Sequence, residues 1–136
     1  MRAAILITLM GGLGSLTRYG IQLVAERIHH ALPFQSPAVG LLSGYLAANV
    51  LGCFMMGWLH SLAAAKMDWP IEIRLAMTVG FLGGLTTFST FASDTRLMLD
   101  QRLWPAAIAN IFLNNGLSIL AVFAGIAVGG HRPLHS

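Results

Sequence analysis

Long apolar stretches separated by short polar clusters make up most of the chain. Residues 28–65, 75–93 and 103–131 contain no Asp, Glu, Lys or Arg, and the charged residues among 3–28 are Arg18, Glu26 and Arg27. A membrane-spanning helix needs about 20 predominantly apolar residues. The pattern therefore predicts a single all-α membrane domain over residues 1–136, with four transmembrane helices at about 3–28, 38–64, 72–100 and 103–129.

Prolines and charged residues mark the expected turns between these helices. Pro33 and Pro37 flank the first loop, Lys66 and Asp68 lie in the second, and Pro105 follows the third at a position typical of the first turn of a helix. Alternation of period two is not sustained over units of about ten residues, which argues against a transmembrane β-barrel.

Composition supports the membrane assignment and argues against nucleic-acid binding, which is a common interpretation of basic proteins. Hydrophobic residues make up 56% of the chain and charged residues 10%, and the mean hydropathy is +0.72. Soluble domains contain about 25% charged residues. The net charge of +3 therefore belongs to a membrane protein, and we expect no nucleic-acid partner.

The positive charges are divided almost equally between the two ends of the predicted bundle. An excess of Lys and Arg on one side normally fixes the orientation of a small membrane protein. Two interpretations follow: a weak bias resolved by the first helix, or dual topology, in which copies insert both ways and pair as an antiparallel homodimer. Four crossings place Arg2, Lys66, Arg74 and Arg132 on one side and Arg27, Arg96 and Arg102 on the other, with Arg18 closer to the second side.

The run Gly80-Phe81-Leu82-Gly83-Gly84-Leu85-Thr86-Thr87-Phe88-Ser89-Thr90-Phe91 lies in the middle of the third helix. Glycines and hydroxyl residues at membrane depth predict an interrupted helix, whose freed backbone groups must face protein, water or an ion. Carbonyl oxygens at such a break are natural ligands for a monovalent cation. Phe88 and Phe91 follow three residues apart, and the electropositive edges of their rings can face an anion, with Asn49, Ser89 or Thr90 as hydrogen-bond donors.

Small residues recur every four positions on the second helix, at Gly40, Gly44, Ala48 and Gly52. They permit close helix packing, either within one chain or between copies. Asn49 lies one position beyond Ala48 and either joins helices or lines a polar path.

A second polar stripe lies on the fourth helix. Asn110, Asn114 and Ser118 are spaced by four residues and share one face. Either hydrogen bonding between helices or a hydrated track for a small ion explains this spacing.

These motifs resemble the Fluc, or CrcB, family of small dual-topology fluoride channels. Gly11-Gly12-Leu13-Gly14-Ser15 with Arg18-Tyr19 is similar to the first-helix motif of the family, Asn49-Val50-Leu51-Gly52-Cys53-Phe54 to its second-helix motif, and residues 80–91 to its signature. The resemblance covers essentially the whole chain. It implies passive fluoride export across a prokaryotic inner membrane, by an antiparallel homodimer with two pores.

The resemblance also implies roles for single residues. Gly83 and Thr86 would give backbone carbonyls to a structural sodium ion at the dimer centre. Phe88 and Phe91 would coordinate fluoride, with Asn49 beside them. The expected pathway consists of Phe88, Phe91, Asn49, Ser89, Thr90, Asn110, Asn114 and Ser118, and Arg18 and Asp94 are expected as vestibule or structural charges.

The sequence departs from the family pattern at several of these positions. Tyr45 stands where a threonine is common, and Asp94 stands where a glutamate is usual. Asn110 and Asn114 occupy positions where tyrosine and serine are frequent, so the polar track is expected to be built differently in this chain.

Two other classes of function are compatible with four small helices. A coupled transporter of the dual-topology multidrug type needs an acid deep in the bundle. The first helix has none at that depth, and Asp94, the one acid near the middle of a predicted span, follows the signature toward the end of its helix. A non-conducting assembly subunit would leave the polar stripe without a purpose. An enzyme is not expected, because the sequence shows no nucleophile and base pair and no metal-binding cluster.

Overall fold

A computed structural model describes residues 1–31, 44–64 and 69–130. These residues contain helices and no strand, and four helical segments are long and apolar enough to cross a membrane, as predicted. The predicted start of the second helix at 38, the loop residues Pro33, Pro37, Lys66 and Asp68, the small residue Gly40 and the charge of Arg132 lie outside the described residues. The elements are α1 (Arg2–Ala31), α3 (Gly44–Ala64), α4 (Ile71–Leu75), the π-helix η1 (Ala76–Leu82), α5 (Gly83–Leu85), α6 (Phe88–Asp100) and α7 (Trp104–Val128).

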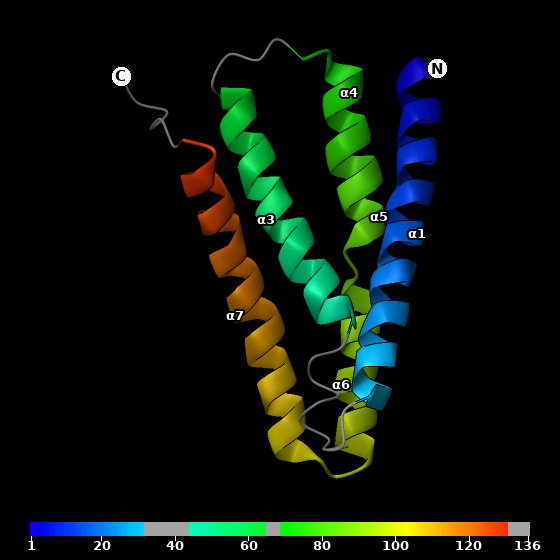
Figure 1. Cartoon of the computed structure of the whole chain (residues 1–136), viewed down its shortest axis with the longest axis vertical. Helices are drawn as coiled ribbons and strands as arrows, with labels where there is room; N and C mark the ends of the chain where they lie inside the picture. Colours follow the sequence, from blue (N-terminus) through cyan, green and yellow to red (C-terminus); the bar gives the residue numbers. More distant parts are fainter. Residues whose placement is uncertain (32–43, 65–68, 131–136) are drawn as a thin grey trace.

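The four spans run in alternating directions and form two packed pairs. α3 lies along α7, and α1 lies along η1 and α5 of the third span (Figure 1). The beginnings of α1 and α4 lie at one end of the bundle, and the turn between α6 and α7 lies at the other (Figure 1). Arg2 and Arg74 therefore belong to the first end, and Arg96 and Arg102 to the second.

The third span changes its backbone geometry twice along its length. Its first half passes from α4 into η1, a π-helix, which is a rare form that is frequent at functional sites. After α5 the chain leaves helical geometry: Thr86 has φ −82° and ψ 151°, and Thr87 has φ −147° and ψ 116°. β-Branched threonines favour such extended angles, and the preceding Gly83 and Gly84 weaken the helix locally.

Glycines set the distance between α1 and the third span. A Cβ atom added to Gly14 would overlap the carbonyl oxygen of Phe81, and one added to Gly84 would overlap the carbonyl oxygen of Gly11. Gly14 is also the one buried residue of α1. Helices in a membrane gain little from apolar burial, so backbone approach of this kind supplies the packing energy that holds them together.

The small-residue stripe of α3 packs against other helices of the same chain. A Cβ atom on Gly44 would meet the backbone of Gln22 in α1, and one on Gly52 would meet the side chain of Thr86. Ala48 is fully buried and forms a core cluster with Leu82 and other apolar residues. Of the two uses expected for this stripe, its described members therefore serve contacts inside the chain.

The turn between α6 and α7 closes with a Schellman arrangement. The Leu103 amide donates to the carbonyl oxygen of Met98 at 2.8 Å, and the Arg102 amide donates to that of Leu99 at 3.0 Å. Arg102 adopts the left-handed conformation, with φ 58°, which this motif requires of the residue after the helix. Pro105 then lies in the first turn of α7.

Adding a methyl group at Gly14 tests the close approach of α1. We expect Gly14→Ala to lower the free energy of unfolding by about 1–3 kcal/mol, because the new Cβ meets backbone that cannot move aside. Gly12→Ala is the matched control, since a Cβ at Gly12 has no neighbour within 4 Å. Thermal unfolding of the detergent-solubilised protein measures both variants, and equal midpoints would contradict this packing.

Candidate functional site

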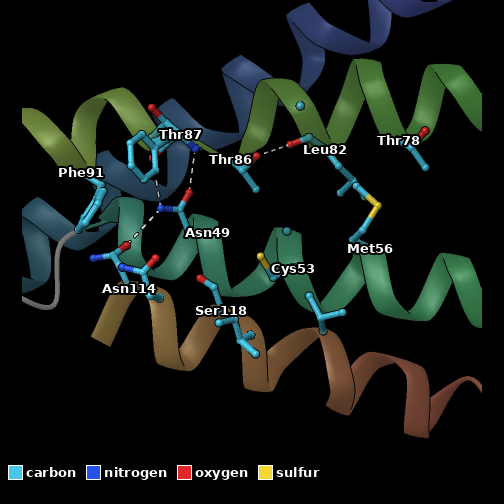
Figure 2. Close-up of a pocket in the computed structure, with 16 residues that line it drawn as sticks. Asn49, Cys53, Met56, Thr78, Leu82, Thr86, Thr87, Phe91, Asn114 and Ser118 are labelled. Carbon is cyan, nitrogen blue, oxygen red and sulfur yellow. Dashed lines mark hydrogen bonds between the residues drawn. The ribbon is translucent and has the colours of Figure 1, made fainter. Parts of the chain in front are cut away.

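An open pocket of about 360 Å³ lies where the third-span break meets α3 and α7. Figure 2 shows Asn49 and Cys53 from α3, Asn114 and Ser118 from α7 and Phe91 from α6 around it. Gly83, Thr86, Thr87, Phe88 and Asn115 also line it. Seven of the predicted site residues thus lie on one pocket: Asn49, Gly83, Thr86, Phe88, Phe91, Asn114 and Ser118.

Asn49 binds the break through both ends of its carboxamide. Its Oδ1 accepts a hydrogen bond from the Thr87 amide at 2.8 Å, and its Nδ2 donates to the Thr87 carbonyl oxygen at 3.2 Å. The same Nδ2 donates to Oδ1 of Asn114 at 3.1 Å. An amide nitrogen carries two hydrogens, so both are used within the chain.

The asparagine contacts continue through α7 to α6. Nδ2 of Asn114 donates to Oδ1 of Asn110 at 2.8 Å, and Nδ2 of Asn110 donates to Oγ1 of Thr95 at 3.0 Å. The Thr95 hydroxyl in turn donates to the carbonyl oxygen of Phe91 at 2.8 Å. Asn110 and Asn114 are 2% and 5% exposed, and hydrogen bonding of this kind is what makes such burial tolerable. We call Asn49, Asn114, Asn110 and Thr95 the amide ladder.

Three hydroxyl groups gather at the start of α6. Thr87 is its N-cap, and its Oγ1 accepts a hydrogen bond from the Thr90 amide at 3.3 Å. Oγ1 of Thr87 lies 3.0 Å from Oγ1 of Thr90 and 3.2 Å from Oγ of Ser89. Hydroxyl hydrogens rotate, so this cluster can redirect its donors.

The two phenylalanines on α6 form a close but asymmetric pair. Their ring centroids are 5.2 Å apart, with an angle of 59° between the ring planes. Phe91 is 7% exposed, whereas Phe88 is 74% exposed. One ring is therefore buried beside the amide ladder, and the other is exposed on the surface of the chain.

The carbonyl groups of Gly83 and Thr86 are released from ordinary helical hydrogen bonds. In a continuous α-helix the Thr87 amide would donate to Gly83 and the Thr90 amide to Thr86. Here those amides donate to Asn49 and to the Thr87 hydroxyl instead. The carbonyl oxygen of Thr86 accepts a long hydrogen bond of 3.4 Å from Nη1 of Arg18.

The released carbonyls fit part of a cation site. Gly83 is exposed on the surface of the chain, and a Cβ atom added to it would meet the Thr78 carbonyl oxygen at 3.9 Å and no atom of another helix within 4 Å. Two carbonyl oxygens do not enclose an ion, so a complete shell would need further ligands. The guanidinium group of Arg18 already occupies one side of the Thr86 oxygen, which leaves Gly83 as the freer ligand. Clusters of three or more His, Cys, Asp or Glu side chains are absent from the part of the chain that the structure describes.

The remaining predicted residues lie near the pocket without lining it. Asn110 is enclosed behind Asn114, and Ser89 and Thr90 belong to the hydroxyl cluster. Arg18 is partly buried at the break. Asp94 is half-buried on α6, one turn beyond Phe91 and outside the pocket lining.

Sequence reasoning missed two residues that connect the site. Thr87 had a visible signal, because a threonine directly before a helical segment is a preferred N-cap. Thr95 had a weaker one: it lies four residues after Phe91, at the spacing that allows a threonine hydroxyl to reach a carbonyl of the preceding turn.

The fold and the site define a small protein of four membrane spans, with a pocket at a helix break that amide, hydroxyl and aromatic side chains line. A family model described as CrcB-like protein, Camphor Resistance (CrcB), matches residues 5–126. The chain belongs to this family, which confirms the resemblance found in the sequence.

Curated relatives are similar over nearly the whole chain. A protein of Rhizobium johnstonii is 40% identical over 129 residues, covering 94% of this chain and 96% of its own. One of Salinibacter ruber is 40% identical over 125 residues (90% and 86%), and one of Shewanella frigidimarina is 35% identical over 126 residues (92% and 94%). Each is named fluoride-specific ion channel FluC. Together with the four spanning helices, these relatives support a multi-pass membrane protein.

Replacing Asn110 tests whether the amide ladder stabilises the bundle. We expect Asn110→Leu to lower the free energy of unfolding by about 1–3 kcal/mol, because it leaves the Asn114 amide and the Thr95 hydroxyl buried without these partners. Asn115→Leu is the matched control: Asn115 is exposed, and its amide donates to Ile111 of its own helix at 2.7 Å. Thermal unfolding midpoints compare the two, and a control as destabilised as Asn110→Leu would show that the ladder adds nothing.

Proposed function

We propose that this protein is a fluoride-selective channel. The observation that carries the proposal is the position of the Phe88 and Phe91 pair beside the amide ladder and the hydroxyl cluster, in a chain whose relatives are named fluoride-specific channels. A small anion that leaves water needs replacement donors, and ring edges, amides and hydroxyls supply partial positive charge without a fixed ion that would trap it. The pathway runs past Phe88, Phe91, Ser89, Thr90, Asn110, Asn114 and Ser118, with Asn49 at its junction with the break.

The same proposal includes an antiparallel homodimer of dual topology with two pores. The nearly equal charges at the two ends give one copy little reason to prefer an orientation. Phe88 is 74% exposed beside polar groups, and Gly83 presents its released carbonyl at the protomer surface. An inverted second copy would cover both and bring the two breaks face to face.

A sodium ion at that interface completes the proposed architecture. Gly83 and Thr86 of each copy would contribute carbonyl oxygens, which suit a hard monovalent cation. When bound, the ion would neutralise the negative ends of the two half-helices and hold the copies together. Arg18 would share the Thr86 oxygen with it.

Export follows from the driving force and needs no coupled proton. An inside-negative potential favours the exit of an anion by about 2.3 kcal/mol per charge for each 100 mV. The proposed location is the inner membrane of a prokaryotic cell.

Fluoride efflux from liposomes that contain the purified protein tests the channel. We expect fluoride to leave much faster than chloride, whether or not a proton gradient is imposed. Absent fluoride flux, or flux that strictly requires protons, would rule out a passive channel in favour of an assembly subunit or a coupled transporter.

Substitution of the phenylalanines tests their part in conduction. We expect Phe88→Ile and Phe91→Ile each to reduce fluoride flux up to about tenfold, because isoleucine keeps the bulk and loses the electropositive ring edge. Phe112→Ile is the matched control, since Phe112 is 73% exposed on α7 and does not line the pocket. Size-exclusion chromatography confirms that each variant keeps its oligomeric state. Normal flux in both Phe88 and Phe91 variants would remove the rings from the mechanism.

Labelling of one turn in intact cells tests dual topology. In a Cys53→Ser background, Gln101→Cys places a single thiol in the exposed turn between α6 and α7. An impermeant maleimide should label about half of the molecules, as two equally populated orientations require. Labelling of all or none of them would show one fixed orientation and contradict the antiparallel dimer.

A further inference from the structure

The two ion sites of the proposed channel share one side chain, Asn49. Its Oδ1 holds the Thr87 amide at 2.8 Å, and this amide is the group that would otherwise bond the carbonyl oxygen of Gly83. Asn49 therefore keeps open a carbonyl proposed for the cation. It does so from α3, a different span from the one that is broken.

The nitrogen of the same carboxamide faces the anion side. One hydrogen goes to the Thr87 carbonyl oxygen at 3.2 Å and the other to Oδ1 of Asn114 at 3.1 Å. No third hydrogen exists to be donated to a passing anion. Asn114 is occupied as well, because its Nδ2 lies 2.8 Å from Oδ1 and 3.3 Å from the backbone oxygen of Asn110.

From these contacts we infer that Asn49 is a positioning residue that couples the cation site to the anion pathway, and that it does not itself bind fluoride. The inference rests on the proposed function. The carboxamide of Asn49 is planar, and it both keeps the Gly83 carbonyl oxygen free and orients Asn114. A cation that stabilises the open break therefore also stabilises the ordered arrangement of the amide ladder. Loss of Asn49 frees the Thr87 amide to return to Gly83, which closes the helix and removes the cation ligand.

Asn114 gives a way to separate the two halves of this coupling. Asn114→Leu removes the contact toward α7 and leaves both bonds between Asn49 and Thr87 in place. Asn49→Leu removes all three bonds. Asn115→Leu is the control for the sodium response, because the Asn115 amide donates its hydrogen bond to Ile111 of its own helix and not to the break.

The experiment measures two quantities on the full protein. The first is the rise in thermal unfolding midpoint when sodium chloride replaces choline chloride, and the second is fluoride flux in liposomes. We expect wild type and Asn115→Leu to show the sodium-dependent rise. Asn49→Leu should lose the rise and its flux, whereas Asn114→Leu should keep the rise while its flux falls by about an order of magnitude.

Several results would overturn the inference. Asn49→Leu with an intact sodium-dependent rise but lost flux would make Asn49 a direct part of the anion pathway. If Asn114→Leu lost the sodium-dependent rise in unfolding midpoint, the cation site and the anion pathway would not be separable at Asn49. If the wild type conducted fluoride without any response to sodium, there would be no cation site for Asn49 to couple to the pathway. Absent fluoride flux in the wild type would instead refute the proposed function.

A measurement on the unaltered protein serves if Asn49→Leu does not fold. In asparagine-labelled protein, sodium titration should shift the side-chain amide resonance of Asn49, and fluoride added at saturating sodium should leave it in place. A resonance that responds to fluoride and not to sodium would overturn the positioning role.

Discussion

Backbone hydrogen bonding across the break is the constraint on which the site depends. A membrane offers no water to satisfy an amide released from a helix, so each freed group needs a partner in the protein. The Thr87 amide finds one in Asn49 and the Thr90 amide finds one in the Thr87 hydroxyl. These two side-chain acceptors satisfy the amides that the break releases. They also leave the carbonyl groups of Gly83 and Thr86 without their helical donors.

The elements around the break hold it from two sides. On one side α1 approaches so closely that Gly14 and Gly84 meet opposing carbonyl groups. On the other, α3 and α7 bring Asn49 and Asn114 together. A short extended segment such as Thr86-Thr87 has few contacts of its own, so its geometry follows from these neighbours. The close glycine crossing and the amide contacts thus act together to hold the extended segment in place.

The sequence was sufficient for the spans and for seven of the residues that line the pocket. Apolar length gave the helices, and spacing by four placed Asn110, Asn114 and Ser118 on one face of α7. Spacing along one helix could not predict which residue of another helix each polar side chain would bind. The bonds from Asn49 to Thr87 join residues 38 positions apart, and Arg18 meets Thr86 from 68 positions away. Such contacts depend on crossing angles and on how deep each helix lies, which no local pattern encodes.

The amide ladder also has a fixed polarity, and the backbone sets it. The Thr87 amide can only donate, so the Asn49 atom facing it must be the oxygen, and the nitrogen must then face Asn114. Each following amide is oriented in the same sense, until the Thr95 hydroxyl donates to the Phe91 carbonyl. Every carboxamide in the series is therefore locked by its neighbour, whereas the hydroxyls of Thr87, Ser89 and Thr90 keep rotatable hydrogens. In the proposed channel, a passing anion would find adaptable donors in the hydroxyl cluster, and Asn110 and Asn114 would form the rigid wall behind it.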